Sequence, residues 1–444
     1  MTKVGQGTQK GLSAKEIVDL NKEYTFYSWS IQGQTNPIPV VKADGVYFWD
    51  ADGKRYLDFA SQLVNMNVGH QNPKVVKAIQ DQAAKLTFVA PGMASEPRGL
   101  LGKKLAEVTP GDLKKTFFTL GGAEANENAV KIARFYTGRH KILARYRSYH
   151  GATHGALALT GDYRRLPVDH VMTGVVHFLD PYCYRCPFGW TRETCHRECI
   201  SHVEEVIQYE GPDQIAAIIM EGVTGSNGLI IPPDDYWPRL REICDKYGIL
   251  LISDEVMSGW GRTGEWFAVD HWNVVPDIIT TAKGITSGYV PLGAVIVREK
   301  IAKFFDDKYL YAGLTYNGHA LACAAALATI EVYEEEKIFE NSRNVGKYLG
   351  KRLDELKAKH PSVGDVRYIG LFSGIELVKN RQTKEPLDLT PLKNFMISNG
   401  VYVFNFKNVL FVVPPLIITE KQLDEGLNLI DEGLSEFMDK QVSE

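Results

Sequence analysis

Four short stretches of the sequence place residues suited to chemistry at the ends of apolar runs. Lys283 follows "DIITTA", and Asp254 follows "GILLIS". The pair Gly121 and Gly122 opens "GGAEANENAVK", which has a helical pattern, and Tyr149 begins "YHG" after "HKILARYRS". Lysine is usually a solvated surface residue, so the position of Lys283 between an apolar run and a glycine-rich turn indicates a special role.

These features suit the binding of pyridoxal phosphate (PLP). This cofactor requires a lysine amine for covalent attachment, an anionic partner for its ring nitrogen and a cradle for its phosphate. Lys283 would supply the amine, and Asp254 would keep the ring nitrogen protonated. The backbone N–H groups of Gly122 and Ala123 would hold the phosphate at a helix N-terminus, where the helix dipole favours anions.

The two faces of the cofactor ring also need neighbours. Tyr149 would stack on one face, and Val256, two residues after Asp254, could cover the other. Each feature alone has a commoner explanation, since a Gly-Gly pair is most often a turn and a tyrosine most often only packs. The order and joint occurrence of all four features predict a PLP site.

The elements that must position these residues form a repeating α/β pattern from about residue 115 onward. Short apolar runs alternate with amphipathic helices, and the runs are "KTFFTL", "HKILAR", "GVVHFL", "IAAIIME", "GILLISDEV", "DIITTA" and "LGAVIV". Runs of this kind predict a mostly parallel sheet that is buried on both faces. Functional residues gather at the carboxyl ends of the strands in such sheets, which is where Lys283 and Asp254 stand.

Capping signals mark the first and last helices. Ser13 with Glu16, and Thr419 with Gln422, form capping-box patterns that predict helix starts. The last third of the chain, about 330–444, indicates a smaller α/β domain.

The composition argues against several classes of protein. The 444 residues are 44% hydrophobic and 23% charged, values typical of a soluble globular protein with roughly two to three domains. The net charge of −4, without a basic stripe, argues against a nucleic-acid-binding surface. No apolar run reaches the length of a membrane span, and the N-terminal stretch lacks the apolar core of a secretory signal, so we expect a cytoplasmic protein.

Four of the six cysteines cluster with the spacing C-x2-C-x8-C-x3-C; they are Cys183, Cys186, Cys195 and Cys199. Two short pairs of thiols can bind zinc. The eight-residue spacer is not a standard zinc-finger spacing, and "PFG" is a turn sequence, so a reduced surface loop without metal is the favoured interpretation. A zinc site remains the alternative.

As a set, longer stretches of the chain resemble the class III aminotransferases, which are PLP enzymes of fold type I. The matching stretches are "GGAEANENAVKIAR", "SYHGATHGALALTG", "GPDQIAAIIMEGVTGSNGLIIPP", "LLISDEVMSGWGRTG", "PDIITTAKGITSGYVPLGAVIV" and "GLTYNGHALACAAALATI". The resemblance covers nearly the whole chain. It implies an α/β fold with a large PLP-binding domain (66–325), a small C-terminal domain (326–444) and an N-terminal segment (1–65) that joins the small domain.

The resemblance also implies the roles of the site residues. Lys283 matches the Schiff-base lysine, Asp254 the partner of the ring nitrogen, and Glu221 a glutamate that supports the site. Thr315 matches a residue that reaches the phosphate in the neighbouring subunit of a homodimer, with both active sites at the interface. The residues expected to bind the cofactor are Gly121, Gly122, Ala123, Tyr149, His150, Asp254, Val256, Lys283 and Thr315.

The implied activity is transamination by a ping-pong mechanism, from an amine donor to a 2-oxo acid. "YCYRCPFG" is similar to a stretch of taurine aminotransferases and related ω-amino acid enzymes. Taurine is therefore the first expectation for the donor, followed by β-alanine and simple amines, with pyruvate or 2-oxoglutarate as acceptor. Two alternatives stay open: a PLP-dependent isomerase, such as an amino acid epimerase or aminomutase, and a non-catalytic protein that keeps the fold.

The group that binds the acid function of the substrate departs from the family pattern. Many relatives that use ω-amino donors have an arginine shortly before "PP", where this chain has Phe404. The nearest cation is Lys407, and Arg164 and Arg165 in "GDYRRLP" are further candidates. Met257 stands where enzymes of the 4-aminobutyrate branch have glutamine, which disfavours that donor. The residues expected to bind substrate are Trp29, Val64, Arg164, Phe404 and Lys407.

Overall fold

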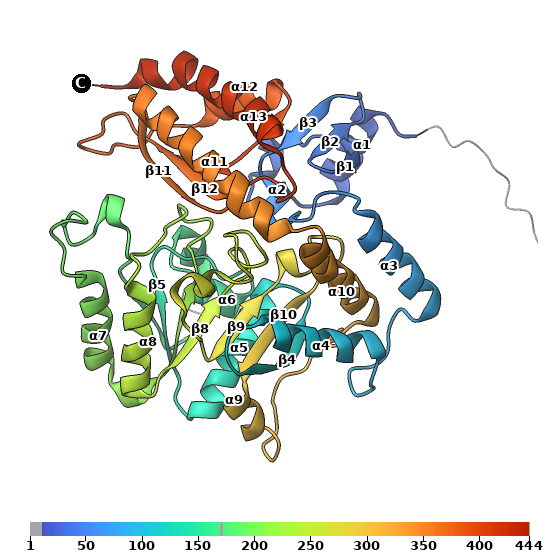
Figure 1. Ribbon diagram of the computed structural model, residues 1–444, viewed down its shortest axis with the longest axis vertical. Coiled ribbons are helices and arrows are strands. Elements are labelled where there is room, and N and C mark those ends of the chain that lie inside the picture. The colour runs from blue at the N-terminus through green and yellow to red at the C-terminus, as the bar shows by residue number, and fades with distance from the viewer. Residues whose placement is uncertain (1–10, 169–171, 444) are drawn as a thin grey trace, which may run out of the picture.

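The computed structural model describes residues 11–168 and 172–443, and a seven-stranded sheet lies at its centre (Figure 1). The strand order is β4-β10-β9-β8-β7-β5-β6. β10 pairs antiparallel with β4 and β9, whereas the other described pairings in this sheet are parallel. The predicted mostly parallel sheet is therefore confirmed. Its strands are β4 (Leu113–Thr119), β5 (Lys141–Arg145), β6 (Val175–Phe178), β7 (Ile215–Glu221), β8 (Leu250–Asp254), β9 (Ile278–Thr281) and β10 (Gly293–Arg298).

Helices between residues 73 and 335 surround this sheet (Figure 1). They are α3 (Pro73–Lys85), α4 (Glu96–Val108), α5 (Gly122–Thr137), α6 (His154–Leu159), α7 (Glu198–Glu210), α8 (Tyr236–Tyr247), α9 (Glu299–Phe304) and α10 (Ala320–Glu335). α3 begins at its proline because the Asn72 side chain accepts a hydrogen bond from the Lys74 N–H at 3.1 Å, which satisfies one of the free donors of the first turn.

Alternate side chains of the central strands pack on the two faces of the sheet. In β7, Ile218 belongs to one hydrophobic cluster together with Trp237 of α8. Its neighbour Ile219 belongs to a second cluster together with Ala129 of α5. Because successive side chains of a strand point to opposite faces, both faces need apolar residues, which explains why "IAAIIME" lacks a polar alternation.

Two four-stranded sheets lie beside the central one. Their orders are β1-β2-β3-β13 and β11-β12-β15-β14. In the first, β13 pairs in parallel with β3, with Val401 opposite Leu57, so segments from both ends of the chain share a sheet. The strands are β1 (Val40–Asp44), β2 (Tyr47–Asp50), β3 (Arg55–Asp58), β11 (Val363–Ile369), β12 (Phe372–Leu377), β13 (Val401–Tyr402), β14 (Phe404–Phe406) and β15 (Val409–Val412).

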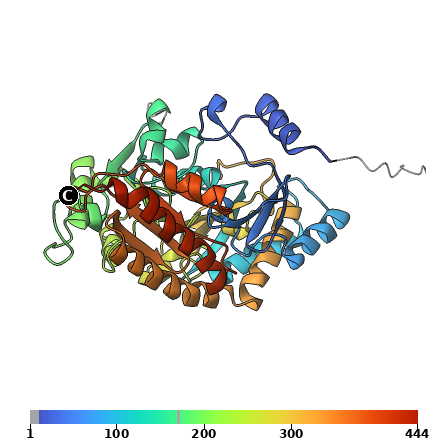
Figure 2. The same cartoon turned by 90° about the horizontal axis from the view of Figure 1, so that it is seen from above.

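The C-terminal helices pack beside these two sheets, and the N-terminal strands lie next to them (Figure 2). The remaining helices are α1 (Ala14–Tyr24), α2 (Ser61–Val64), α11 (Ile338–Lys359), α12 (Thr390–Ser398) and α13 (Glu420–Gly433). Both predicted capping boxes are present, at Ser13 before α1 and at Thr419 before α13. Within the described residues, no helix combines the length and apolar character needed to span a bilayer.

Candidate active site

A cavity of about 630 Å³ opens at the carboxyl ends of β7, β8 and β9. Glu221 ends β7, Asp254 ends β8, and Lys283 follows β9 by two residues. Neighbouring parallel strands therefore bring three distant segments of the chain to one edge of the sheet. The predicted site residues that line this cavity are Trp29, Val64, Gly121, Gly122, Ala123, Tyr149, His150, Arg164, Glu221, Asp254, Val256, Lys283 and Phe404.

Lys283 occupies a strained backbone position beside the cavity. Its φ of +46° lies in the left-handed region, which residues with a side chain adopt rarely and at an energetic cost. Burial lowers the pKa of Lys283 to about 8, against the opposing influence of Asp254 and Glu221. Gly284 follows because a Cβ atom there would lie 2.6 Å from Cβ of Trp260. The glycine is thus required by close packing rather than by an unusual φ.

Asp254 is held in a fixed orientation by three neighbours. Asn126 Nδ2 donates to Oδ2 at 2.7 Å, and Nδ1 of His150 lies 2.7 Å from the same oxygen. The backbone N–H of Val256 donates to Oδ1 at 3.0 Å. Asn126 is itself oriented, because its Oδ1 accepts a hydrogen bond from Thr280 Oγ1 at 2.6 Å. This network fixes the carboxylate that faces the cavity.

Asn126 is a site residue that sequence reasoning missed. It lies one turn into α5 from Gly122 and is fully buried, as are Ala125 and Ala129 of the same helix. A polar side chain on the buried face of a helix requires a hydrogen-bond partner. That periodicity was the signal that could have identified it, although the partner itself is 128 residues away in Asp254.

The N-terminus of α5 lies directly against the end of β8. A Cβ atom on Gly122 would lie 2.8 and 2.9 Å from the methyl groups of Val256, so only glycine allows this approach. Gly121, which precedes the helix, is different, because a Cβ atom there would meet no atom within 4 Å. The first N–H groups of the helix have no intrahelical partners, and Gly122 and Ala123 line the cavity, which therefore offers a place for an anion at the helix N-terminus.

Glu221 ties the Tyr149 segment to the sheet. Its Oε1 accepts a hydrogen bond from the Tyr149 N–H at 3.0 Å, and its Oε2 accepts one from the Gly225 N–H at 2.6 Å. Burial raises the pKa of Glu221. The first of these bonds holds the Tyr149 segment beside the cavity, and the second holds the turn that follows β7.

Arg164 brings a guanidinium group to the cavity wall. Its Nε donates to Oδ1 and Oδ2 of Asp162 at 3.0 and 2.9 Å, and its Nη2 donates to Ser226 Oγ at 3.1 Å. The guanidinium carbon lies 4.0 Å from the ring centroid of Tyr149, a cation–π contact. Among the described residues Nη1 has no hydrogen-bond partner, so it can donate to an anionic ligand in the cavity that Arg164 lines.

Two predicted site residues lie away from this cavity. Lys407 is exposed at the tip of the β14–β15 hairpin, with φ of +50°, and its Nζ lies 5.9 Å from the ring centroid of Tyr163. The hairpin turn points its side chain to solvent, whereas Phe404 at the start of β14 does line the cavity. Thr315 is exposed on the connection between α9 and α10 and does not line the cavity of its own chain.

The donors and acceptors around this cavity fit PLP. Oδ1 of Asp254 accepts one described hydrogen bond, which leaves a lone pair for the protonated nitrogen of the ring. Nε2 of His150 is buried without a partner among the described residues. With the Lys283 amine and the open N-terminus of α5, the cavity offers an attachment point, an anion for the ring and a phosphate cradle.

Comparison with protein families gives one match for most of the chain. Residues 30–434 match the family model described as "Aminotransferase class-III". A leucine/methionine racemase of Thermococcus litoralis is 40% identical over 418 residues, which cover 92% of this chain and 93% of that protein. A taurine–pyruvate aminotransferase of Bilophila wadsworthia is 38% identical over 446 residues, which cover 95% and 97%.

Comparison with solved structures gives the same fold. The structure of a taurine:2-oxoglutarate aminotransferase from Bifidobacterium kashiwanohense, in complex with PLP and glutamate, matches with a TM-score of 0.94 and 43% identity. The match covers 98% of this chain and 100% of that one.

Proposed function

The chain belongs to the class III aminotransferases, and within this PLP-dependent family we propose that it transfers the amino group of taurine to a 2-oxo acid. Pyruvate and 2-oxoglutarate are the acceptors that the names of its relatives support. The observation that carries the proposed donor is the guanidinium of Arg164, held at the wall of the same cavity as Lys283.

The residues around the cavity would divide the work of a transaminase. When bound, PLP supplies an aldehyde that reacts with amines and a ring that withdraws electrons from the neighbouring carbon. Asp254, fixed by Asn126 and His150, would hold the proton on the ring nitrogen. Lys283, with a pKa lowered to about 8 by burial, would accept and return a proton near neutral pH.

The acid group of the donor would be bound by Arg164. Asp162 and Ser226 hold this side chain, while Nη1 is left for a ligand. A sulfonate offers several oxygens to the fork of a guanidinium, as a carboxylate does. Trp29, Tyr149 and Phe404 line the same cavity and would enclose the short carbon chain of the donor, which favours a small ω-amino acid.

An amino acid racemase is the second candidate function. A leucine/methionine racemase is as similar to this chain as the taurine enzymes are, and isomerisation would use the same lysine, carboxylate and phosphate cradle. The two reactions differ in outcome, because a racemase returns the amine in its mirror-image form and needs no 2-oxo acid.

A half-reaction separates these functions. Taurine alone is added to PLP-loaded protein, and the visible absorbance of the bound cofactor is followed. We expect the yellow absorbance to disappear as the amino group moves to the cofactor, and to return on addition of pyruvate or 2-oxoglutarate. Loss of optical rotation from L-leucine or L-methionine, with no change caused by taurine, would establish the racemase instead.

We further propose the domain division and a homodimer. The parallel pairing of β3 with β13 supports an N-terminal segment (1–65) that joins the small domain (326–444), beside a large domain (66–325).

Exposed side chains near the site support the homodimer. Leu63 lines the cavity yet is 65% exposed. Thr315 is also exposed, as are Tyr311 and Tyr316 close to it in the sequence. A second subunit would cover such side chains, and sedimentation analysis of the purified protein tests this assembly.

A further inference from the structure

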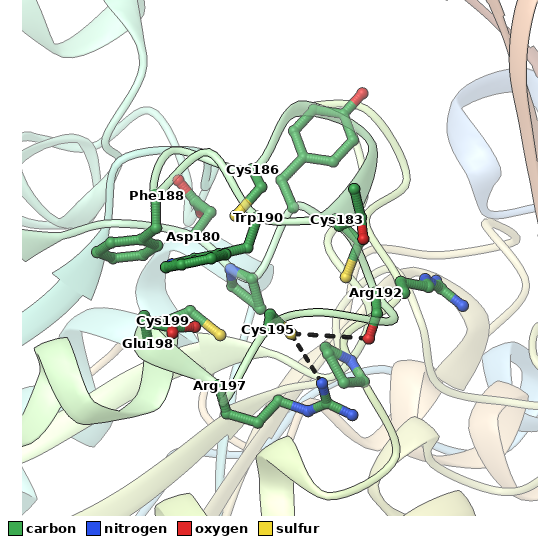
Figure 3. A pocket seen from close by; sticks show the side chains of 14 residues that line it. Asp180, Cys183, Cys186, Phe188, Trp190, Arg192, Cys195, Arg197, Glu198 and Cys199 are labelled. Atoms are coloured by element: carbon green, nitrogen blue, oxygen red, sulfur yellow. Dashed lines mark hydrogen bonds between the residues drawn. The ribbon is translucent and has the colours of Figure 1, made fainter.

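A four-cysteine cluster lies outside the cofactor site, in the connection between β6 and α7. Cys183, Cys186, Cys195 and Cys199 all line one small cavity of about 20 Å³. Figure 3 shows their sulfur atoms on the inner side of the loop, around a common space. All four are free thiols. A cavity of this size holds about one water molecule or small ion.

The connection that carries these cysteines has little regular structure of its own. Residues 179–197, all described, contain the 3₁₀ turn Cys183–Arg185 and neither a strand nor an α-helix. Backbone hydrogen bonds shape the turns, among them those from Gly189 N–H to Cys186 O at 3.2 Å and from Cys195 N–H to Thr191 O at 3.1 Å. Connections of this length without regular structure are uncommon in compact domains and are often functional.

We propose that the four-cysteine cluster is a structural zinc site. Zn²⁺ is bound by four thiolates in tetrahedral geometry in closed structural sites. Two thiols come from the turn at Cys183 and Cys186, one from Cys195, and one from Cys199 in the first turn of α7. Binding would convert the thiols to thiolates and release their protons to water, so no oxidant or reductant is needed.

Positive groups next to the cluster suit the charge of such a site. Four thiolates and one Zn²⁺ leave two negative charges in excess. Arg197 Nη1 donates to Cys195 Sγ at 2.9 Å while its Nε donates to Asp235, and Arg192 lines the same cavity, as do the carboxylates of Asp180 and Glu198 (Figure 3). Donors of this kind around the ligands orient them and tune the affinity for metal.

The thiols would have to close in on the ion. In the described ranges 11–168 and 172–443, no three Cys, His, Asp or Glu side chains are already arranged to hold a metal. A cysteine side chain turns about a single bond, Cα–Cβ, between staggered positions, and the four sulfurs already border one cavity. We therefore expect the sulfur positions to differ measurably between the zinc-free and the zinc-bound protein.

Zinc at this position would also hold a contact between distant parts of the chain. The hydroxyl of Tyr182 and the guanidinium of Arg185 both donate to Glu376 of β12. Lys384 Nζ donates to the carbonyl oxygen of Tyr184 at 2.6 Å. These three loop residues stand beside Cys183 and Cys186 in sequence, so a metal that fixes the cysteines would fix this contact with the C-terminal sheet.

The zinc content of the full-length, PLP-loaded protein tests the proposal. The protein is expressed with zinc in the medium, passed over a chelating resin to remove loosely bound metal, and analysed by inductively coupled plasma mass spectrometry. We expect roughly one zinc ion per chain. Protein refolded with Co²⁺ in place of Zn²⁺ should show the thiolate-to-cobalt charge-transfer bands of a tetrahedral sulfur site.

Variants locate the metal. Cys195→Ser and Cys199→Ser should each lower the affinity for zinc at least roughly tenfold, measured by competition with a chelator, because removing a ligand weakens binding at least as much as removing a residue that orients a ligand. Cys323→Ala is the matched control, because Cys323 is a buried free thiol in α10, outside the cluster, and should keep the zinc of the parent protein. If the cluster variants fail to fold, the metal content and cobalt spectrum of the parent protein decide.

Three results would overturn the zinc site. The first is parent protein with less than about a tenth of a zinc ion per chain under these conditions. The second is a cluster variant that folds and binds zinc with the affinity of the parent protein. The third is a disulfide between any two of the four cysteines, detected by mass spectrometry of protein purified without reductant.

Discussion

Removing the guanidinium of Arg164 tests how the donor is recognised. Arg164→Met keeps a flexible side chain that replaces the apolar stem of the arginine but cannot donate a hydrogen bond. Two matched variants accompany it. Asp162→Asn/Arg164→Met removes the carboxylate that Arg164 would leave unpaired, since the Asp162 side chain is only 6% exposed. Lys407→Met removes the exposed cation that lies outside the cavity.

The expected size of the effect follows from the contacts of Arg164. A hydrogen bond to a charged group contributes about 1.5–3 kcal/mol, which corresponds to a roughly 10- to 150-fold change in half-saturation. The cation–π contact between Arg164 and Tyr149 at 4.0 Å contributes about 0.5–1 kcal/mol. That second loss affects every donor, whereas the first affects only donors that carry an acid group.

The assay is the single-turnover half-reaction, which needs no 2-oxo acid and so separates donor binding from acceptor binding. The rate of loss of the cofactor's visible absorbance is measured over a series of concentrations, first with taurine and then with benzylamine, an amine without an acid group. We expect both Arg164 variants to raise the half-saturating concentration of taurine roughly 10- to 150-fold. Benzylamine should change by less than about fivefold, and Lys407→Met should behave as the parent protein with both donors.

Equal changes for taurine and benzylamine would refute the proposed role of Arg164, because the loss would then concern the shape of the cavity and not the acid group. A large effect of Lys407→Met on taurine alone would also refute it. In that case the β14–β15 hairpin would have to move its exposed lysine into the cavity.

Three further predictions concern the cofactor site. Capture of PLP by the cofactor-free protein should accelerate as pH rises through about 8, the pKa to which burial lowers Lys283, because the neutral amine that reacts with the aldehyde is the minor form below that pH. Stopped-flow absorbance measures the rate of capture, and a midpoint near the ordinary lysine pKa would contradict the prediction. Gly122→Ala should lower the free energy of unfolding by about 1–3 kcal/mol, because the added methyl group overpacks against Val256. Gly121→Ala should leave the free energy of unfolding unchanged, since no atom lies within 4 Å of that Cβ position. Chemical denaturation of the two cofactor-free variants compares them. Asn126→Ala should weaken PLP binding roughly tenfold, because it removes a hydrogen bond of about 1.5 kcal/mol to a carboxylate, and an unchanged affinity by fluorescence titration would show that the carboxylate needs no such support.

The sequence determined which residues stand at the ends of the central strands. Lys283 and Asp254 each follow an apolar run directly. A strand that is buried on both faces appears in the sequence as such a run, so it can be recognised without knowing which strands pair with it. The Gly122 helix start and both capping boxes were predictable for the same reason. Each depends on residues within a few positions of one another, where hydrogen bonds and backbone preferences are local.

Only the tertiary structure decided which distant side chains meet. Asn126 reaches Asp254 across 128 residues, and nothing near either residue in the sequence indicates the pair. Arg164 and Lys407 were equal candidates by charge, yet the folded chain places Arg164 on the cavity wall and Lys407 at an exposed hairpin tip. The spacing of the four cysteines likewise left open whether their thiols share a space. Contacts of this kind depend on the order of the strands and the path of the loops between them, which hydrophobic packing over the whole chain sets, and local patterns carry no information about that order.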